Sequence, residues 1–251
     1  MVNAYLCTYR RKTPSPRELR QTKVAAERDP LLRTFLEGFD NTYYDWGDDP
    51  SFFAAEHLLG NVRRASWGVC RRDVRNTLGE GDLVVFFCGC QDERVWRYYF
   101  VGFGTAGELV ERAALWTDPA HASYRKFYNV LARFDGKGLV QSETFHDYHD
   151  DWERRAEAPY VLFDAAHSAF NLRSPHHVAT WDGGIVPETW AADARSRELE
   201  RLLFVERGID RRLRTAPTGY GHTKLNLMRA GRTTRPGRSL SELTRALRQL
   251  V

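Results

Sequence analysis

The fold of this chain is decided by residues 66–105, which read SWGVCRRDVRNTLGEGDLVVFFCGCQDERVWRYYFVGFGT. Gly81 and Asp82 indicate a corner, because glycine accepts the left-handed conformation that ends a helix and aspartate holds a turn through nearby backbone amides. Residues 83–88 form a continuous run of β-branched and aromatic side chains, which is typical of a strand buried on both faces. Residues 95–104 carry a second such run, so the stretch predicts a basic helical turn, a corner and a pair of strands connected by residues 88–94.

This unit resembles the centre of the PUA-like superfamily (the PUA, ASCH, EVE and YTH domains), in which a helix runs into a Gly-Asp strand of a small β-barrel. Residues 68–87, GVCRRDVRNTLGEGDLVVFF, are most similar to the bacterial nucleotide-modification-associated domains of that superfamily. The resemblance implies an α+β fold, a PUA-like small mixed β-barrel with peripheral helices. It also implies a part in nucleic-acid modification, modification-dependent restriction or phage defence.

The composition is that of a soluble globular protein, with 251 residues, 28% charged and 42% hydrophobic. No apolar run approaches the length needed to cross a bilayer, and the first residues, MVNAYLCTYRRK, lack the apolar core of a signal peptide. The four cysteines are too few and too unevenly spaced for a disulfide framework. We therefore expect a cytoplasmic protein that does not bind a membrane.

Positive charge is concentrated at the C-terminal end. Residues 207–251 hold eleven Lys/Arg and two acids, a net charge of +9, which leaves −5 for the rest of the chain. Such a segment is typical of a polyanion-binding arm, although a solvated arginine-rich tail explains it equally well. Ser239 and Glu242 form a capping box before leucines at helical spacing, which predicts a final helix packed on the body. The expected organisation is a PUA-like domain with N-terminal helices over 1–206 and a basic C-terminal arm and helix over 207–251.

Two tryptophans are candidates for contact with a nucleobase, because reading an unpaired base requires flat apolar faces. Trp46 lies between Asp45 and Gly47 in a polar loop, where a core role is hard to defend. Ser66 and Trp67 are also flanked by polar residues, and the YTH-like resemblance implies that a Ser/Trp pair near this point lines the pocket. For both tryptophans, a place in the core remains an equal alternative.

The second strand contributes further aromatic residues. Strand alternation places Trp96 and Tyr98 on one face and Tyr99 on the other, so the three cannot line one pocket. We predict Trp96 and Tyr99 to lie mainly in the core and Tyr98 to contact the base.

The basic turn before the corner is a candidate phosphate site. Arg71 and Arg75 are four residues apart and are predicted to share a helical face, where the pair would clamp a phosphate bidentately. The alternative for each arginine is a salt bridge to a nearby acid, namely Asp73, Glu80 or Asp82.

A third candidate site lies around His146, His149 and Asp150, with two histidines beside carboxylates. An acid–base pair, metal ligands and a solvated loop all fit, and Asp150 is also suited to accept a hydrogen bond from a base amino group. Cys88 and Cys90 form a lone CxC, and the histidines lack a known zinc spacing, so neither a metal nor a cofactor is expected.

The fourth candidate is the loop that contains Asn171, Arg173 and His176, since polar loop residues on a rigid scaffold often bind ligands. Asn171 and Arg173 are predicted to contact nucleic acid, and His176 is a candidate for acid–base chemistry. The leading hypothesis is a module that binds DNA or RNA, possibly modified, or a nucleotide, and accommodates a base in an aromatic-lined pocket. The alternatives are a hydrolase or nuclease that uses His146, His149, Asp150 or His176, and a structural or protein-interaction subunit.

Overall fold

The chain divides into two compact units in a computed structural model. Unit 1 comprises Met1–Arg11, Leu78–Ala106 and Ala166–Val251, and unit 2 comprises Lys12–Thr77 and Gly107–Ala165. The structure describes residues 3–10, 64–68, 71–93, 95–125, 130, 132–141, 152–171, 174–182, 189–205, 222–226 and 240–251. The predicted boundary between 206 and 207 lies outside these residues.

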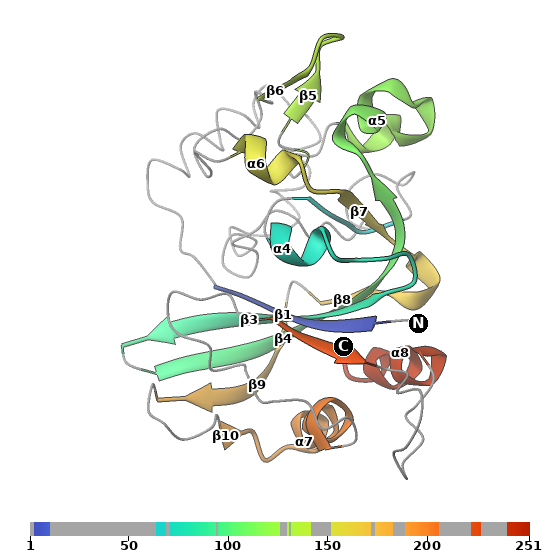
Figure 1. The fold of residues 1–251 in the computed structure, drawn as a ribbon. Coiled ribbons are helices and arrows are strands. Elements are labelled where there is room, and N and C mark those ends of the chain that lie inside the picture. Colours follow the sequence, from blue (N-terminus) through green and yellow to red (C-terminus); the bar gives the residue numbers. More distant parts are fainter. Residues whose placement is uncertain are drawn as a thin grey trace. The chain divides into compact units, whose positions relative to one another are not determined.

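Unit 1 is built on a mixed sheet with the strand order β10-β9-β4-β3-β1-β11 (Figure 1). The strands are β1 (Asn3–Arg10), β3 (Leu83–Asp92), β4 (Val95–Val110), β9 (His176–Trp181), β10 (Thr189–Trp190) and β11 (His222–Asn226). Strand β1 is parallel to β3, and the other neighbours in this order are antiparallel. The α+β class is confirmed, but the sheet is not closed into a barrel over the residues described.

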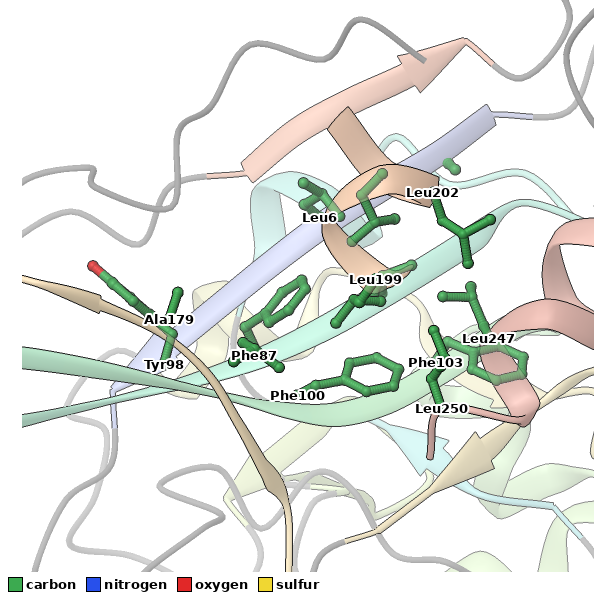
Figure 2. Packing of buried hydrophobic residues seen from close by; sticks show 14 of the residues in the cluster. Leu6, Phe87, Tyr98, Phe100, Phe103, Ala179, Leu199, Leu202, Leu247 and Leu250 are labelled. Carbon is green, nitrogen blue, oxygen red and sulfur yellow. The ribbon is translucent and has the colours of Figure 1, made fainter. Parts of the chain in front are cut away.

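Two helical segments cover one face of this sheet. They are α7 (Ala194–Glu200), which continues as a π-helix (Arg201–Val205), and α8 (Leu240–Arg248). Their leucines pack against Phe87, Phe100 and Phe103 of β3 and β4 (Figure 2). The buried leucines are Leu199, Leu202, Leu203, Leu243, Leu247 and Leu250. The predicted packing of the last helix is therefore confirmed, and its driving force is burial of this apolar face.

The predicted corner forms at Gly81 and Asp82, but it does not end the helix, because α4 (Arg72–Arg75) already ends at Arg75 with Asn76 as its C-cap. Gly81 has φ +85°, and its N–H donates to the carbonyl of Ala106 at 2.7 Å. The Asp82 carboxylate accepts from the backbone N–H of Gly79 at 2.9 Å and of Asn3 at 2.7 Å. Asp82 thereby fastens the turn before β3 to the start of β1.

Strand β4 approaches a short strand, β8 (Ala169–Phe170), very closely at Gly102. Gly102 has φ +141°, and a Cβ there would lie 2.3 Å from the carbonyl oxygen of Ala169. The prediction of a loop is wrong for His176, because His176 is the first residue of β9 and β8 lies just before Asn171. Pairing with β4 supplies the hydrogen bonds that order this segment, and the local sequence does not reveal that pairing.

Unit 2 contains short elements. Its strands are β2 (Ser66–Trp67), β5 (Ala132–Phe134), β6 (Leu139–Gln141) and β7 (Tyr160–Phe163), and its helices are α4 (Arg72–Arg75), α5 (Arg112–Thr117), the 3-10 helix Pro119–Tyr124 and α6 (Trp152–Ala156). Strand β2 pairs with β7, and β5 pairs with β6 across the turn DGKG at residues 135–138. Within the described ranges, no helix of either unit has the length and apolarity needed to cross a membrane.

Candidate functional site

Ser66 and Trp67 lie in the interior of unit 2, where β2 pairs with β7. The hydroxyl of Tyr160 donates to the Ser66 hydroxyl at 2.8 Å. The Trp67 ring is stacked with Phe163, with centroids 6.4 Å apart and an interplanar angle of 15°. Both residues are fully buried. Their contacts are those of a packed core, and the predicted base contact stays a prediction.

Arg71 and Arg75 do not share an exposed helical face. Arg71 precedes α4 in a left-handed conformation (φ 53°) and pairs with Asp73 at 2.6 Å, which confirms one of the salt bridges considered from the sequence. Arg75 is fully buried, and its guanidinium donates to three backbone carbonyls at 2.6–3.1 Å, those of Arg155, Ala158 and Pro159. Arg75 therefore secures the segment that follows α6.

A second buried arginine in unit 2 gave no signal in the sequence. Arg112 donates to the carbonyl of Gly68, and its guanidinium carbon lies 4.9 Å from the centre of the Tyr160 ring. Burial, and after it the charge of Arg75, lower the pKa of Arg112 well below its usual value. The two guanidinium groups are thus close enough for each to oppose the charge of the other.

His176 contacts a carboxylate and a hydroxyl through the same ring nitrogen. Its Nε2 lies 3.0 Å from Oδ1 of Asp193 and 3.0 Å from Oγ of the buried Ser196. A nucleophilic triad needs the hydroxyl and the carboxylate on opposite nitrogens of the imidazole, so this group does not form one. Asp193 also caps α7 by accepting from the N–H of Ser196 at 2.9 Å. The contacts of Asp193 with His176 and Ser196 therefore order the start of α7.

Asn171 and Tyr98 also have structural contacts. The amide of Asn171 donates to the carbonyls of Ser174 and Val251 at 3.0 Å and 3.2 Å, which connects the loop after β8 to the end of α8. Tyr98 belongs to the core beneath α7 and α8 (Figure 2). The other predicted site residues lie outside the described residues: Trp46, His146, His149, Asp150 and Arg173.

The face of the sheet opposite α7 and α8 carries a set of side chains that we call the Tyr99 strip, consisting of Arg97, Tyr99, His177 and Thr180. Arg97 and Tyr99 alternate along β4 with the core residues Trp96 and Tyr98. They are register partners of Thr180 and His177 on β9. Arg97 is exposed, and the other three are partly exposed. The strip therefore combines a cation with two aromatic rings on one sheet face.

The two rings of the Tyr99 strip hold each other in place. Their centroids are 5.4 Å apart with an interplanar angle of 62°, and Nε2 of His177 lies 3.1 Å from Oγ1 of Thr180. Burial lowers the pKa of His177, and the nearby Arg97 adds to this effect, while a hydrogen bond to the Ala179 backbone opposes it. The imidazole is therefore a neutral aromatic ring at neutral pH.

Strand alternation indicated that Tyr99 lies opposite Trp96 and Tyr98, but the prediction chose Tyr98 for base contact. Tyr98 is 3% exposed and belongs to the core, so its contact with a base stays a prediction, whereas Tyr99, which was expected mainly in the core, is partly exposed. The sequence does not indicate that His177 lies beside Tyr99, because the neighbouring His176 is expected in a loop and not in a strand.

The described part of the basic C-terminal segment includes α8, whose outward side borders a hollow of about 420 Å³. Its lining includes Glu242, Arg245, Ala246 and Gln249. Arg245 and Arg248 are both exposed, and Arg248 donates to the carbonyls of Ala166 and Ser168. Arg248 thus helps to dock the helix.

No protein-family model, curated protein or solved structure matches this chain.

Proposed function

We propose that this chain binds nucleic acid or a nucleotide, and that a base stacks on the Tyr99 strip. The observation that carries the proposal is the placement of Arg97, Tyr99 and His177 together on the sheet face opposite the helices. Aromatic side chains on a sheet are a common platform for bases, and base–aromatic stacking tolerates any base because each has a π-face. Arginine binds phosphate through two parallel hydrogen bonds.

The charge of the chain supports a polyanionic ligand. The register neighbours of Arg97 are the uncharged residues Cys90 and Thr180. Residues 207–251 carry a net charge of +9, which attracts a nucleic acid over a longer range.

The resemblance of residues 66–105 supports the same class of ligand. On that resemblance alone, the proposal includes a PUA-like fold, a modified base and a part in nucleic-acid modification, restriction or phage defence. The hydrolase or nuclease alternative depends mainly on His146, His149 and Asp150. The contacts of His176 do not add to it, because a single ring nitrogen takes both of its polar partners.

Fluorescence polarisation with a labelled oligonucleotide, measured between about 50 and 200 mM salt, tests the proposal. We expect Arg97→Ala to weaken binding and to reduce the slope of log affinity against log salt by about one. The matched control is Arg197→Ala, which removes an exposed arginine from α7 on the helical side of the sheet. Absence of binding at low salt, or equal effects of the two substitutions, would contradict the proposal.

A further inference from the structure

Resting on the proposed function, we infer that the Tyr99 strip binds an unpaired segment of a nucleic-acid strand and does not read a duplex. The ligand class is thus a single strand, with one base against the rings of Tyr99 and His177 and an adjacent phosphate at Arg97. Three features of the strip lead to this inference.

The first feature is the partial burial of the two rings. Tyr99 and His177 are only partly exposed, and they lie within the ladder between β4 and β9. The base edges of a duplex lie at the floor of a major groove about 8.5 Å deep or a minor groove about 6 Å wide. Partly buried rings on a sheet surface do not reach such a floor, whereas an unpaired base is able to lie against them.

The second feature is that the rings are already ordered. The edge-to-face contact between Tyr99 and His177 at 5.4 Å and the 3.1 Å contact between His177 and Thr180 restrict both side chains. A base that stacks there costs little additional side-chain entropy. In a duplex the two faces of each base are covered by the adjacent bases. Only an unstacked base therefore has a face free to lie against the rings of Tyr99 and His177.

The third feature is the spacing of ring and cation. Arg97 and Tyr99 are two residues apart on β4, so their Cα atoms are about 7 Å apart on the same face. An arginine side chain is long enough to cover the distance from a stacked base to the phosphate of the same nucleotide. The strip is thus suited to one nucleotide of a strand.

The test compares binding of a fluorescein-labelled single strand of about a dozen nucleotides, as DNA and as RNA, with binding of the duplex formed from the same strand. We expect the single strand to bind more tightly by roughly fivefold to a hundredfold. Tyr99→Leu, which keeps an apolar side chain without a ring face, should abolish this preference, and Tyr99→Phe should keep it. Thermal unfolding of each variant checks that the fold is retained.

The outcomes separate the inference from the proposed function. If the duplex binds as tightly as the single strand or more tightly, the inference is wrong but nucleic-acid binding stands. The same holds if Tyr99→Leu still prefers the single strand to the duplex. If a free mononucleotide displaces the labelled strand as effectively as the unlabelled strand does, the site binds nucleotides, and the inference is again wrong. No binding of either probe at low salt overturns both.

Discussion

Tyr99 and His177 stand edge to face across β4 and β9, with ring centroids 5.4 Å apart. A register shift between Tyr98 and Tyr99 creates this contact: Tyr98 pairs with Ala179 and Tyr99 pairs with His177, so Val178 is the additional residue on β9. Bulges of this kind redirect side chains. Here the bulge buries Val178 and brings an imidazole next to the tyrosine on the opposite face.

Replacing Arg75 should destabilise unit 2 strongly. Arg75→Met removes the donors for the carbonyls of Arg155, Ala158 and Pro159, and each unsatisfied buried acceptor costs about 1–3 kcal/mol. We expect a loss of at least about 3 kcal/mol, measured by urea unfolding. The control is Arg72→Met, which breaks a partly exposed ion pair with Glu157 and should cost no more than about 1 kcal/mol. Equal losses would contradict the role assigned to Arg75.

The close approach of β4 and β8 requires a glycine at position 102. Gly102→Ala places a Cβ 2.3 Å from the carbonyl oxygen of Ala169 and forces alanine to φ +141°. Gly81→Ala is the matched comparison, because its φ is +85° and nothing lies within 4 Å of the added Cβ. We expect a cost of about 1–2 kcal/mol for Gly81→Ala and a clearly larger one for Gly102→Ala, measured by thermal unfolding. The reverse order of the two costs would show that β8 is not packed as described.

Asp193 should contribute to acid stability. Partial burial alone would raise the pKa of Asp193, but hydrogen bonds from Ser196 and His176 outweigh it and lower the pKa from 3.8 to about 2. A carboxyl group whose pKa is lower in the folded state stabilises the fold above its unfolded pKa and loses that effect as pH falls from there. Asn also caps helices well, so Asp193→Asn removes the charge with little loss of the cap.

The expected result is a difference in unfolding free energy between the natural chain and Asp193→Asn that is largest above pH 3.8 and shrinks towards pH 2. Urea unfolding at a series of pH values measures it. A difference that does not change with pH would show that the charge of Asp193 has no such role.

Arg195 should hold the end of α8 in place. Its Nε donates to the carbonyl of Leu250 at 2.6 Å, and its guanidinium also donates to the carbonyl of Val251. We expect Arg195→Ala to increase hydrogen exchange across residues 240–251, because partial opening of the helix becomes easier by about 1 kcal/mol or more. Arg245→Ala removes an exposed arginine from the same helix and should leave the exchange unchanged. If both variants behave alike, the contacts of Arg195 do not determine the docking.

The local sequence was sufficient for the elements around residues 66–105. The strands β3 and β4 and the Gly81 corner were predicted, because each has a strong local signal in apolar runs or turn residues. Strand β9 was missed. Its sequence, His176 to Trp181, does not alternate regularly because of the bulge at Val178, and only its pairing with β4 makes it a strand.

The candidate site was less predictable than the fold. The sequence shows that Arg75 is a cation near a turn, but it does not show that three carbonyls surround its guanidinium. The sequence leaves Trp67 equally suited to a pocket and to the core, and only the burial of Ser66 and Trp67 shows that their contacts are those of a core. Burial and strand partners depend on contacts between residues distant in the sequence, which local spacing does not contain.

Photocrosslinking tests directly whether an unpaired base lies against Tyr99 and His177. A single-stranded oligonucleotide that carries 5-iodouracil is irradiated with the full chain, and the crosslinked peptide is identified by mass spectrometry. We expect a crosslink at Tyr99 or His177, which is lost in Tyr99→Leu if Tyr99 is the crosslinked residue. A crosslink confined to residues 207–251, for example at Tyr220, would contradict the account and assign nucleic-acid binding to the basic C-terminal segment.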